Sequence, residues 1–233
     1  MTEELSTPNA YPAMNPVETW IKALTQPRED AYRSIVNDPG ASIGKAVLWL
    51  AGFGFVGGLL SGIGAAIFGS SAFQQIDQIF SQYGGMSFDM PATRGGFMAI
   101  VSNSFGGLFG AVIGGLILVG LVQLVSRMLG GTGSFEKLFY GYAAYAAPML
   151  LVTGLIGSIP FVNFCLSPLL GIYGIVLAVM ANKATHGYDT GKAVIAVLAP
   201  AFIFFLLCCC VVFGFTALLA PIFGETFNNF MVP

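Results

Sequence analysis

Four long stretches of the chain contain no aspartate, glutamate, lysine or arginine, and this pattern constrains the fold more than any single motif. A membrane-spanning helix needs about 20 mostly apolar residues to cross roughly 30 Å of hydrocarbon. Charged residues make up 9% of the chain, whereas soluble domains carry roughly 25%. The sequence therefore predicts an integral membrane protein built from helices. The charge-free stretches are residues 46–76, 95–126, 138–182 and 193–224.

The lengths of these stretches predict five spans. The first, second and fourth stretches each accommodate one helix, whereas residues 138–182 are long enough for two helices and a tight turn. The turn signal is "GSIPFVN" at 157–163, with Pro160 at its centre. We therefore predict an all-α integral membrane bundle of five transmembrane helices. The predicted spans are 46–68, 97–122, 140–159, 163–181 and 193–220.

The remaining segments complete the predicted organisation. The polar, proline-rich start of the chain lacks the basic residues and apolar core of a signal peptide. We expect a disordered tail over 1–15, cytoplasmic amphipathic or interfacial helices over 16–40, the membrane domain over 41–221 and a short extracytoplasmic tail over 222–233.

The basic residues predict the orientation of the bundle. Lysine and arginine in short loops favour the cytoplasmic side of a membrane. Eight of the nine cations fall on the side of the N-terminus and only Arg94 falls on the other, so we predict a cytoplasmic N-terminus and an outside C-terminus. The eight are Lys22, Arg28, Arg33, Lys45, Arg127, Lys137, Lys183 and Lys192.

The sequence "GFGFVG" at 52–57 matches the dinucleotide-binding pattern G-x-G-x-x-G, but the context excludes that function. Such a motif lies between a buried strand and a helix with a solvated face, and no charged residue occurs from 46 to 76. Glycines spaced by four residues share one helix face and let membrane helices approach closely. We predict a packing seam between the first two spans; the alternative is that glycine is simply common in membrane helices. The seam residues are Gly54, Gly58, Gly62, Gly106, Gly110 and Gly114.

Residues 15–40 predict two amphipathic helices separated by Pro27. Apolar positions at helical spacing include Val17 and Trp20 in the first helix and Tyr32 and Ile35 in the second. With nearby cations, such helices are typical of the lipid headgroup layer, although packing on the bundle or on a partner protein is the alternative. The predicted membrane-surface or partner contacts are Trp20, Ile21, Lys22, Leu24, Arg28 and Arg33.

Catalytic and metal-binding patterns are weak in this sequence, and we expect no enzyme activity, cofactor or metal. His186 and Asp189 offer an acid–base pair, but Asp189 or Thr190 is also placed to cap the last span. Cys208, Cys209 and Cys210 are consecutive, so their side chains point about 100° apart on a helix and do not converge on one ion. The net charge of −2 gives no indication of nucleic-acid binding.

The segments "WIKALTQPREDAYRSI" (20–35), "YAAYAAPMLLVTGLIGSIPFVN" (142–163) and "GIYGIVLAVMANKATHGYDTGKAVIAVLAPAFIFF" (171–205) resemble the Yip family, the Ypt/Rab-interacting proteins, and especially its short prokaryotic-type members. The resemblance covers roughly 16–213. It implies five spans, a cytoplasmic N-terminus and a role in membrane traffic. Eukaryotic relatives bind prenylated Rab GTPases, so a Rab partner and a Golgi or ER location are expected only for a eukaryotic source, and the cell membrane otherwise.

Together these observations predict a non-catalytic multi-pass membrane protein that organises or shapes the membrane, or acts as a membrane adaptor. The expected partners are the bilayer with its anionic lipids and protein partners or a second copy of the chain. The alternative is a passive channel or a lipid or small-solute transporter, because uncharged polar residues lie within or near the spans. These residues are Ser102, Asn103, Ser104, Gln123, Thr153, Ser167 and Thr216.

Overall fold

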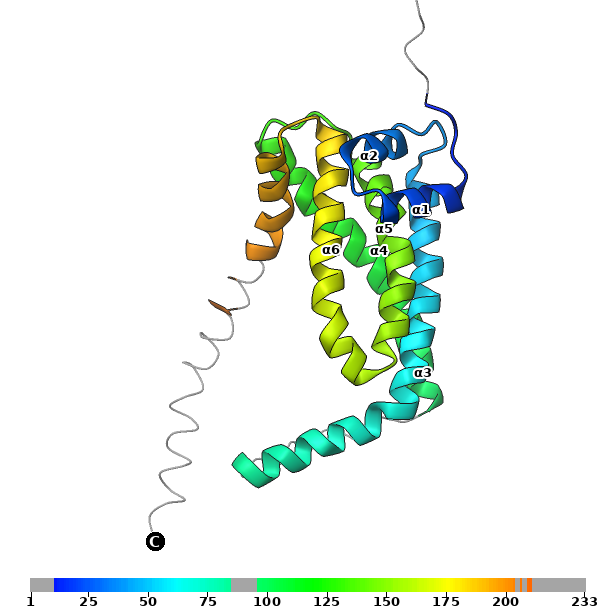
Figure 1. Cartoon of the computed structure of the whole chain (residues 1–233), viewed down its shortest axis with the longest axis vertical. Helices are drawn as coiled ribbons and strands as arrows, with labels where there is room; N and C mark the ends of the chain where they lie inside the picture. The colour runs from blue at the N-terminus through cyan, green and yellow to red at the C-terminus, as the bar shows by residue number, and fades with distance from the viewer. Residues whose placement is uncertain (1–10, 85–95, 204–205, 207–208, 211–233) are drawn as a thin grey trace, which may run out of the picture.

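The structure is a computed structural model that describes residues 11–84, 96–203, 206, 209 and 210, without the side chains of 69–84 and Pro160. All regular elements among these residues are α-helices (Figure 1). The helices are α1 (Pro16–Thr25), α2 (Glu29–Val36), α3 (Ile43–Gly84), α4 (Phe97–Met128), α5 (Phe135–Gly157) and α6 (Pro160–His186), followed by a shorter apolar helix, Thr190–Ile203.

Four segments among the described residues are long and apolar enough to cross a membrane, which confirms the all-α class and four of the predicted spans. Five spans are not confirmed. The fifth prediction, 193–220, coincides with the Thr190–Ile203 helix, whose 14 residues reach about 21 Å, and most of 204–220 lies outside the described residues. The four segments are Ile43–Phe68, Phe97–Met128, Phe135–Gly157 and Phe161–His186.

Short connections join α4 to α5 and α5 to α6, and neighbouring helices from α3 to α6 run antiparallel. α5 ends at Gly157 and α6 begins at Pro160, as the turn signal predicted. Proline suits the first turn of a helix because the N–H that it lacks has no partner there. α6 ends at His186 and is followed by Gly187, whose φ of 70° is the left-handed conformation that glycine adopts without strain.

Because of these reversals, one end of the bundle holds the starts of α3 and α5 and the ends of α4 and α6. We call it the capped end, because α1 and α2 lie across it (Figure 1), and we call the opposite end the far end. All eight cations of the predicted N-terminal side belong to segments at or near the capped end. Beyond Phe68, α3 continues to Gly84 and turns away from the bundle axis (Figure 1).

The glycines predicted on the first span lie against α4. A Cβ atom on Gly54 would come within 2.5 Å of the Gly107 carbonyl oxygen, and one on Gly62 within 2.8 Å of the Ile100 Cα. A Cβ atom on Gly58 would overlap the carbonyl oxygen of Asn103. These backbones therefore touch, and any side chain at the three glycines would force the two spans apart.

The glycines predicted on the second span do not face this contact, and the structure corrects that part of the seam. A Cβ atom on Gly106, Gly110 or Gly114 would meet nothing within 4 Å. Gly107, one position along the helix, faces Gly54 instead. Residues that repeat every four positions move gradually off one face, because the helix has 3.6 residues per turn. The buried face of α4 instead has residues at alternating spacings of three and four. Its buried positions include Ser104, Gly115, Val119, Val122 and Ser126.

A second close contact, between α3 and α5, was not predicted. A Cβ atom on Gly154 would overlap the Gly57 backbone. One turn further along α5, the Ser158 hydroxyl donates a hydrogen bond of 2.8 Å to the carbonyl oxygen of Leu60. The signal was present in the sequence, because Gly154 and Ser158 are small residues four apart, as are Gly57 and Ser61.

Candidate functional site at the capped end

The start of helix α1 is set by a capping residue and a proline. The Asn15 side chain caps the helix by accepting a 2.8 Å hydrogen bond from the Glu18 N–H, and Pro16 occupies the first turn. The Trp20 ring packs edge-on at 5.5 Å from Trp49 and 4.7 Å from Phe53, both on α3. Trp20 is therefore a half-buried packing residue between α1 and the first span.

The outward face of α1 differs from this packed face. Val17 and Ile21, one turn apart, are 55% and 58% exposed. Ile21 was among the predicted contact residues and Val17 was not; of the other predicted contacts, Lys22 and Leu24 are half-buried and Arg28 is exposed. The exposed side chains of Val17 and Ile21, with Lys22 and Arg28 nearby in the chain, thus form an apolar surface on α1 that the bundle does not cover. We call Val17 and Ile21 the α1 apolar pair.

The apolar strip of α2 is buried against the bundle, which is the packing that the alternative for residues 15–40 describes. The strip packs near α5 and α6, and the Tyr32 hydroxyl donates a 3.0 Å hydrogen bond to the Ala23 carbonyl oxygen of α1. Burial raises the pKa of the Tyr32 phenol. Helical periodicity identifies an apolar face, but tertiary structure decides what covers it. The buried positions are Ala31, Tyr32, Ile35 and Val36.

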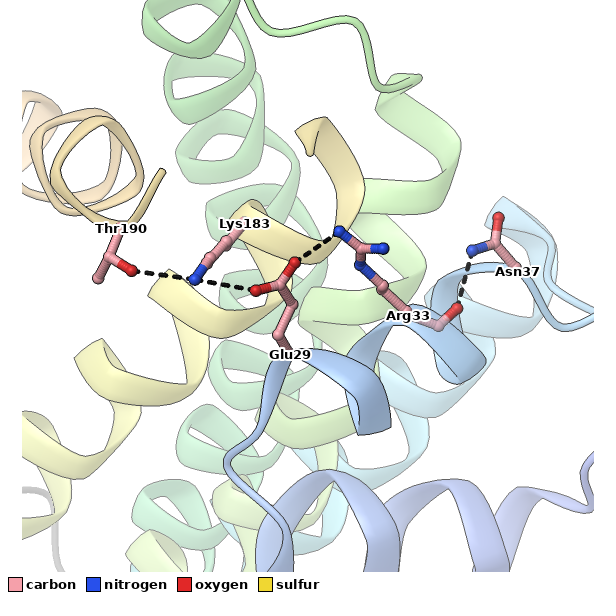
Figure 2. A network of polar contacts seen from close by, with 5 residues as sticks. All are labelled: Glu29, Arg33, Asn37, Lys183 and Thr190. Carbon is pink, nitrogen blue, oxygen red and sulfur yellow. Dashed lines mark hydrogen bonds and ion pairs between the residues drawn. The ribbon is translucent and has the colours of Figure 1, made fainter. Parts of the chain in front are cut away.

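Polar contacts tie α2 to the end of α6 (Figure 2). The Glu29 carboxylate lies 2.7 Å from the Arg33 guanidinium and 2.9 Å from the Lys183 ammonium. The hydrogen bond from Lys183, followed by that from Arg33, holds the pKa of Glu29 below its ordinary value despite the opposing effect of burial. Lys183 also donates to the Thr190 hydroxyl at 3.0 Å, so it joins α2, α6 and the next helix. Arg33, a predicted surface contact, is exposed but engaged in this network.

The linker that follows α2 is fixed to α5. The Lys137 ammonium donates a 2.7 Å hydrogen bond to the Asn37 side chain. The Tyr140 hydroxyl donates to the buried Asp38 carboxylate at 3.4 Å, and the Gly40 N–H donates to the same carboxylate at 2.8 Å. These bonds and the Glu29–Lys183 pair hold the α1–α2 cap on the bundle from two sides.

The structure places His186 and Asp189 in separate roles. The His186 Nδ1 accepts a 3.1 Å hydrogen bond from the Gly133 N–H, and its ring stacks on Tyr188 at 5.3 Å. The Asp189 carboxylate accepts from the Lys192 N–H at 3.3 Å, so it caps the Thr190–Ile203 helix as the alternative reading expected. Both residues therefore position a turn between helices.

Sequence reasoning missed a buried polar network beside this turn. The Ser126 hydroxyl donates to the Asn182 side-chain oxygen at 3.0 Å and accepts from the Tyr188 hydroxyl at 2.9 Å. The bonds link α4, α6 and the turn before the next helix, and they explain why polar residues are buried at the ends of apolar spans. A signal for it existed, since Ser126 and Asn182 each lie at the edge of a charge-free stretch.

Within the part of the chain that the structure describes, no group of three histidine, cysteine, aspartate or glutamate side chains is arranged to hold a metal ion. Cys165 and Cys210 are exposed and Cys209 is half-buried, all as free thiols. Cys208 lies outside the described residues.

Among the described residues, four apolar helices of spanning length, capped by two docked helices, define a multi-pass α-helical membrane protein. The chain matches the model of the Yip1 domain over residues 21–213 and belongs to that family, which confirms the resemblance noted in the sequence. Members of this family are generally non-catalytic membrane proteins of trafficking. No curated protein and no solved structure matched the chain.

Proposed function

We propose that this protein is a non-catalytic membrane adaptor that organises the bilayer at its capped end and holds protein partners there. The observation that carries the proposal is the α1 apolar pair. Val17 and Ile21 are more than half exposed on a helix whose other face is fixed to the bundle by Trp20. A surface helix with an exposed apolar pair and adjacent cations suits the headgroup layer or a protein groove.

The capped end faces the cytoplasm in this proposal, because eight cations gather there and only Arg94 belongs to the opposite side. Each cation near anionic lipid contributes about 1 kcal/mol of attraction. The capped end would therefore collect anionic lipid around α1. Binding of a Rab GTPase would follow only if the source is eukaryotic.

The experiment replaces the α1 apolar pair in the full chain with Val17→Glu and Ile21→Glu. This variant should keep its thermal stability, because both side chains point away from the packed face of α1. Crosslinking and affinity capture from native membranes, with lipid analysis of the same sample, should show a loss of anionic lipid and of protein partners. If the variant captures the same lipids and proteins as the parent, the α1 apolar pair is not the working surface.

A matched control replaces the same residues with Val17→Leu and Ile21→Leu, which preserves the apolar surface and should preserve capture. Trp20→Glu is unsuitable for this purpose, because it would break the contacts with Trp49 and Phe53. A change in capture by that variant would report damage to the cap.

A second candidate, a passive path for a lipid or a small solute, is favoured by one observation. A cavity of about 360 Å³ lies between α3, α4 and α5, and Ser61, Ser102 and Asn103 contribute to its lining. A flux assay in reconstituted liposomes separates the two candidates. If the purified protein conducts a solute, the adaptor function is rejected and the passive path is accepted in its place.

A further inference from the structure

Two neighbouring cavities differ in character. The first, of about 360 Å³, is lined largely by glycine backbone and by four uncharged polar residues, Ser61, Ser102, Asn103 and Thr153. The glycines that allow α3, α4 and α5 to approach closely leave peptide groups without covering side chains there. We call this space the polar groove. Its lining offers hydroxyl, amide and peptide groups, all of which are hydrogen-bonding partners without charge.

The second cavity, of about 570 Å³, lies between α5, α6 and the Thr190–Ile203 helix, with Leu118 of α4 at its edge. Its lining is mostly apolar and includes Met149, Gly174 and Val197. Tyr142 and Tyr145 also line this cavity, on the segment of α5 nearer the capped end. We call this space the apolar cavity.

The two spaces adjoin, because Leu150 and Thr153 of α5 line both of them. Their shared part lies toward the far end of the bundle. Thr153 is four residues from the end of α5, about 6 Å along the helix, and Ser102 is five residues from the start of α4, about 8 Å. From this level the apolar cavity extends along α6 from Asn163 to Ala178, toward the capped end.

The two spaces together match the shape and polarity of an amphiphilic molecule that enters from the leaflet at the far end. A long apolar space continues from a smaller polar one, and both lie within spans that contact hydrocarbon. No aspartate, glutamate, lysine or arginine is among the described residues that line either space. A phosphate group placed there would have no cation to pair with, and burying an unpaired charge is costly.

We propose that the polar groove and the apolar cavity together bind one uncharged glycerolipid of the far leaflet. Its hydroxyl and ester groups occupy the polar groove and one acyl chain occupies the apolar cavity. The inference rests on the cavities alone and is independent of the α1 apolar pair.

The test uses the full chain in lipid nanodiscs with a diacylglycerol that carries a diazirine in one acyl chain. After irradiation, mass spectrometry should place the label on Met149 and Gly174. Gly174→Leu fills the apolar cavity, and its Cβ has room because the nearest atom, the Met149 methyl, is 3.8 Å away. This variant should reduce labelling about tenfold, equivalent to a loss of about 1.4 kcal/mol of binding free energy.

Gly120→Leu is the matched control, because Gly120 lies outside both spaces and has nothing within 4 Å of its Cβ position. It should label like the parent. A second variant, Ser102→Ala with Thr153→Val, should lower labelling by diacylglycerol more than labelling by a phosphatidylglycerol with the same chain. Both hydroxyls bond only to carbonyl oxygens of their own helices, so the fold does not depend on them.

Three results would overturn the proposal. The label could fall only on outward-facing residues such as Phe161 and Phe164, with no effect of Gly174→Leu. Phosphatidylglycerol could compete as well as unlabelled diacylglycerol, which would remove the selection for an uncharged head. Crosslinks could instead join Met149 to residues 204–221, which would show that the chain itself fills the apolar cavity.

Discussion

The carboxylate of Glu29 on α2 lies 2.9 Å from the ammonium of Lys183, three residues before the end of α6 (Figure 2). The two residues are far apart in the sequence, and their contact fixes the N-terminal cap to the last described span. Because Lys183 also bonds Thr190, the pair connects the cap to the start of the next helix.

The first prediction concerns the pH dependence of this pair. The pKa of Glu29 is lowered in the folded protein from its ordinary value of 4.5. Its stabilising effect is therefore fully present above pH 4.5 and is lost as the pH falls through the lower, folded pKa. Glu29→Gln should remove this acid-sensitive contribution to the free energy of unfolding. The loss at neutral pH should be less than about 1 kcal/mol, because the pair is partly exposed. Thermal unfolding in detergent, measured against pH for parent and variant, checks this; parallel curves below pH 4.5 would contradict it.

The second prediction concerns the contact between α3 and α4. Gly107→Leu should lower the stability by about 1–3 kcal/mol or more, because its side chain would overlap the backbone of Gly54. Gly110→Leu changes the same residue type on the same helix, where nothing lies within 4 Å, and should be tolerated. The measurement is the unfolding temperature in detergent. Equal losses in both variants would show that α4 packs by another face.

The third prediction concerns the contact between α3 and α5. Gly154→Ala should destabilise the bundle, because even a methyl group would overlap the Gly57 backbone. Gly157→Ala, three residues on, meets its nearest atom, the Ser61 Oγ, at 3.7 Å, which is an ordinary contact. Alanine there should be neutral, or stabilising by about 0.5–1 kcal/mol from reduced backbone entropy. The measurement is the unfolding temperature of both variants in the same detergent. A Gly154→Ala variant as stable as the parent would contradict the close contact between α3 and α5.

The fourth prediction concerns the number of spans. A reporter attached after Val232 and another within residues 5–12 should lie on opposite sides of the membrane if residues 193–220 complete a fifth span. The physical reason is that an odd number of crossings separates the two ends of a chain. Accessibility of the two reporters in sealed vesicles is the measurement. Reporters on the same side would contradict a fifth span and agree with the four spans found among the described residues.

The sequence by itself determined that this is a helical membrane protein, where four of its spans lie and that eight of its nine cations belong to one end. Those properties depend on local composition, since the absence of charge over about 20 residues is enough to specify a span. It also placed Gly54, Gly58 and Gly62 on one face of α3, because their spacing matches the helix period.

Only the tertiary structure decided which surfaces meet. Gly107 rather than Gly110 touches α3, because the alignment of two long helices sets which of several similar faces is in contact. The apolar strip of α2 is buried while Val17 and Ile21 of α1 stay exposed, although both helices have the same amphipathic pattern. The Glu29–Lys183 pair and the paired cavities join residues that no local pattern relates. The sequence shows which side chains are apolar or charged, and the packing of the whole chain determines which residues they contact.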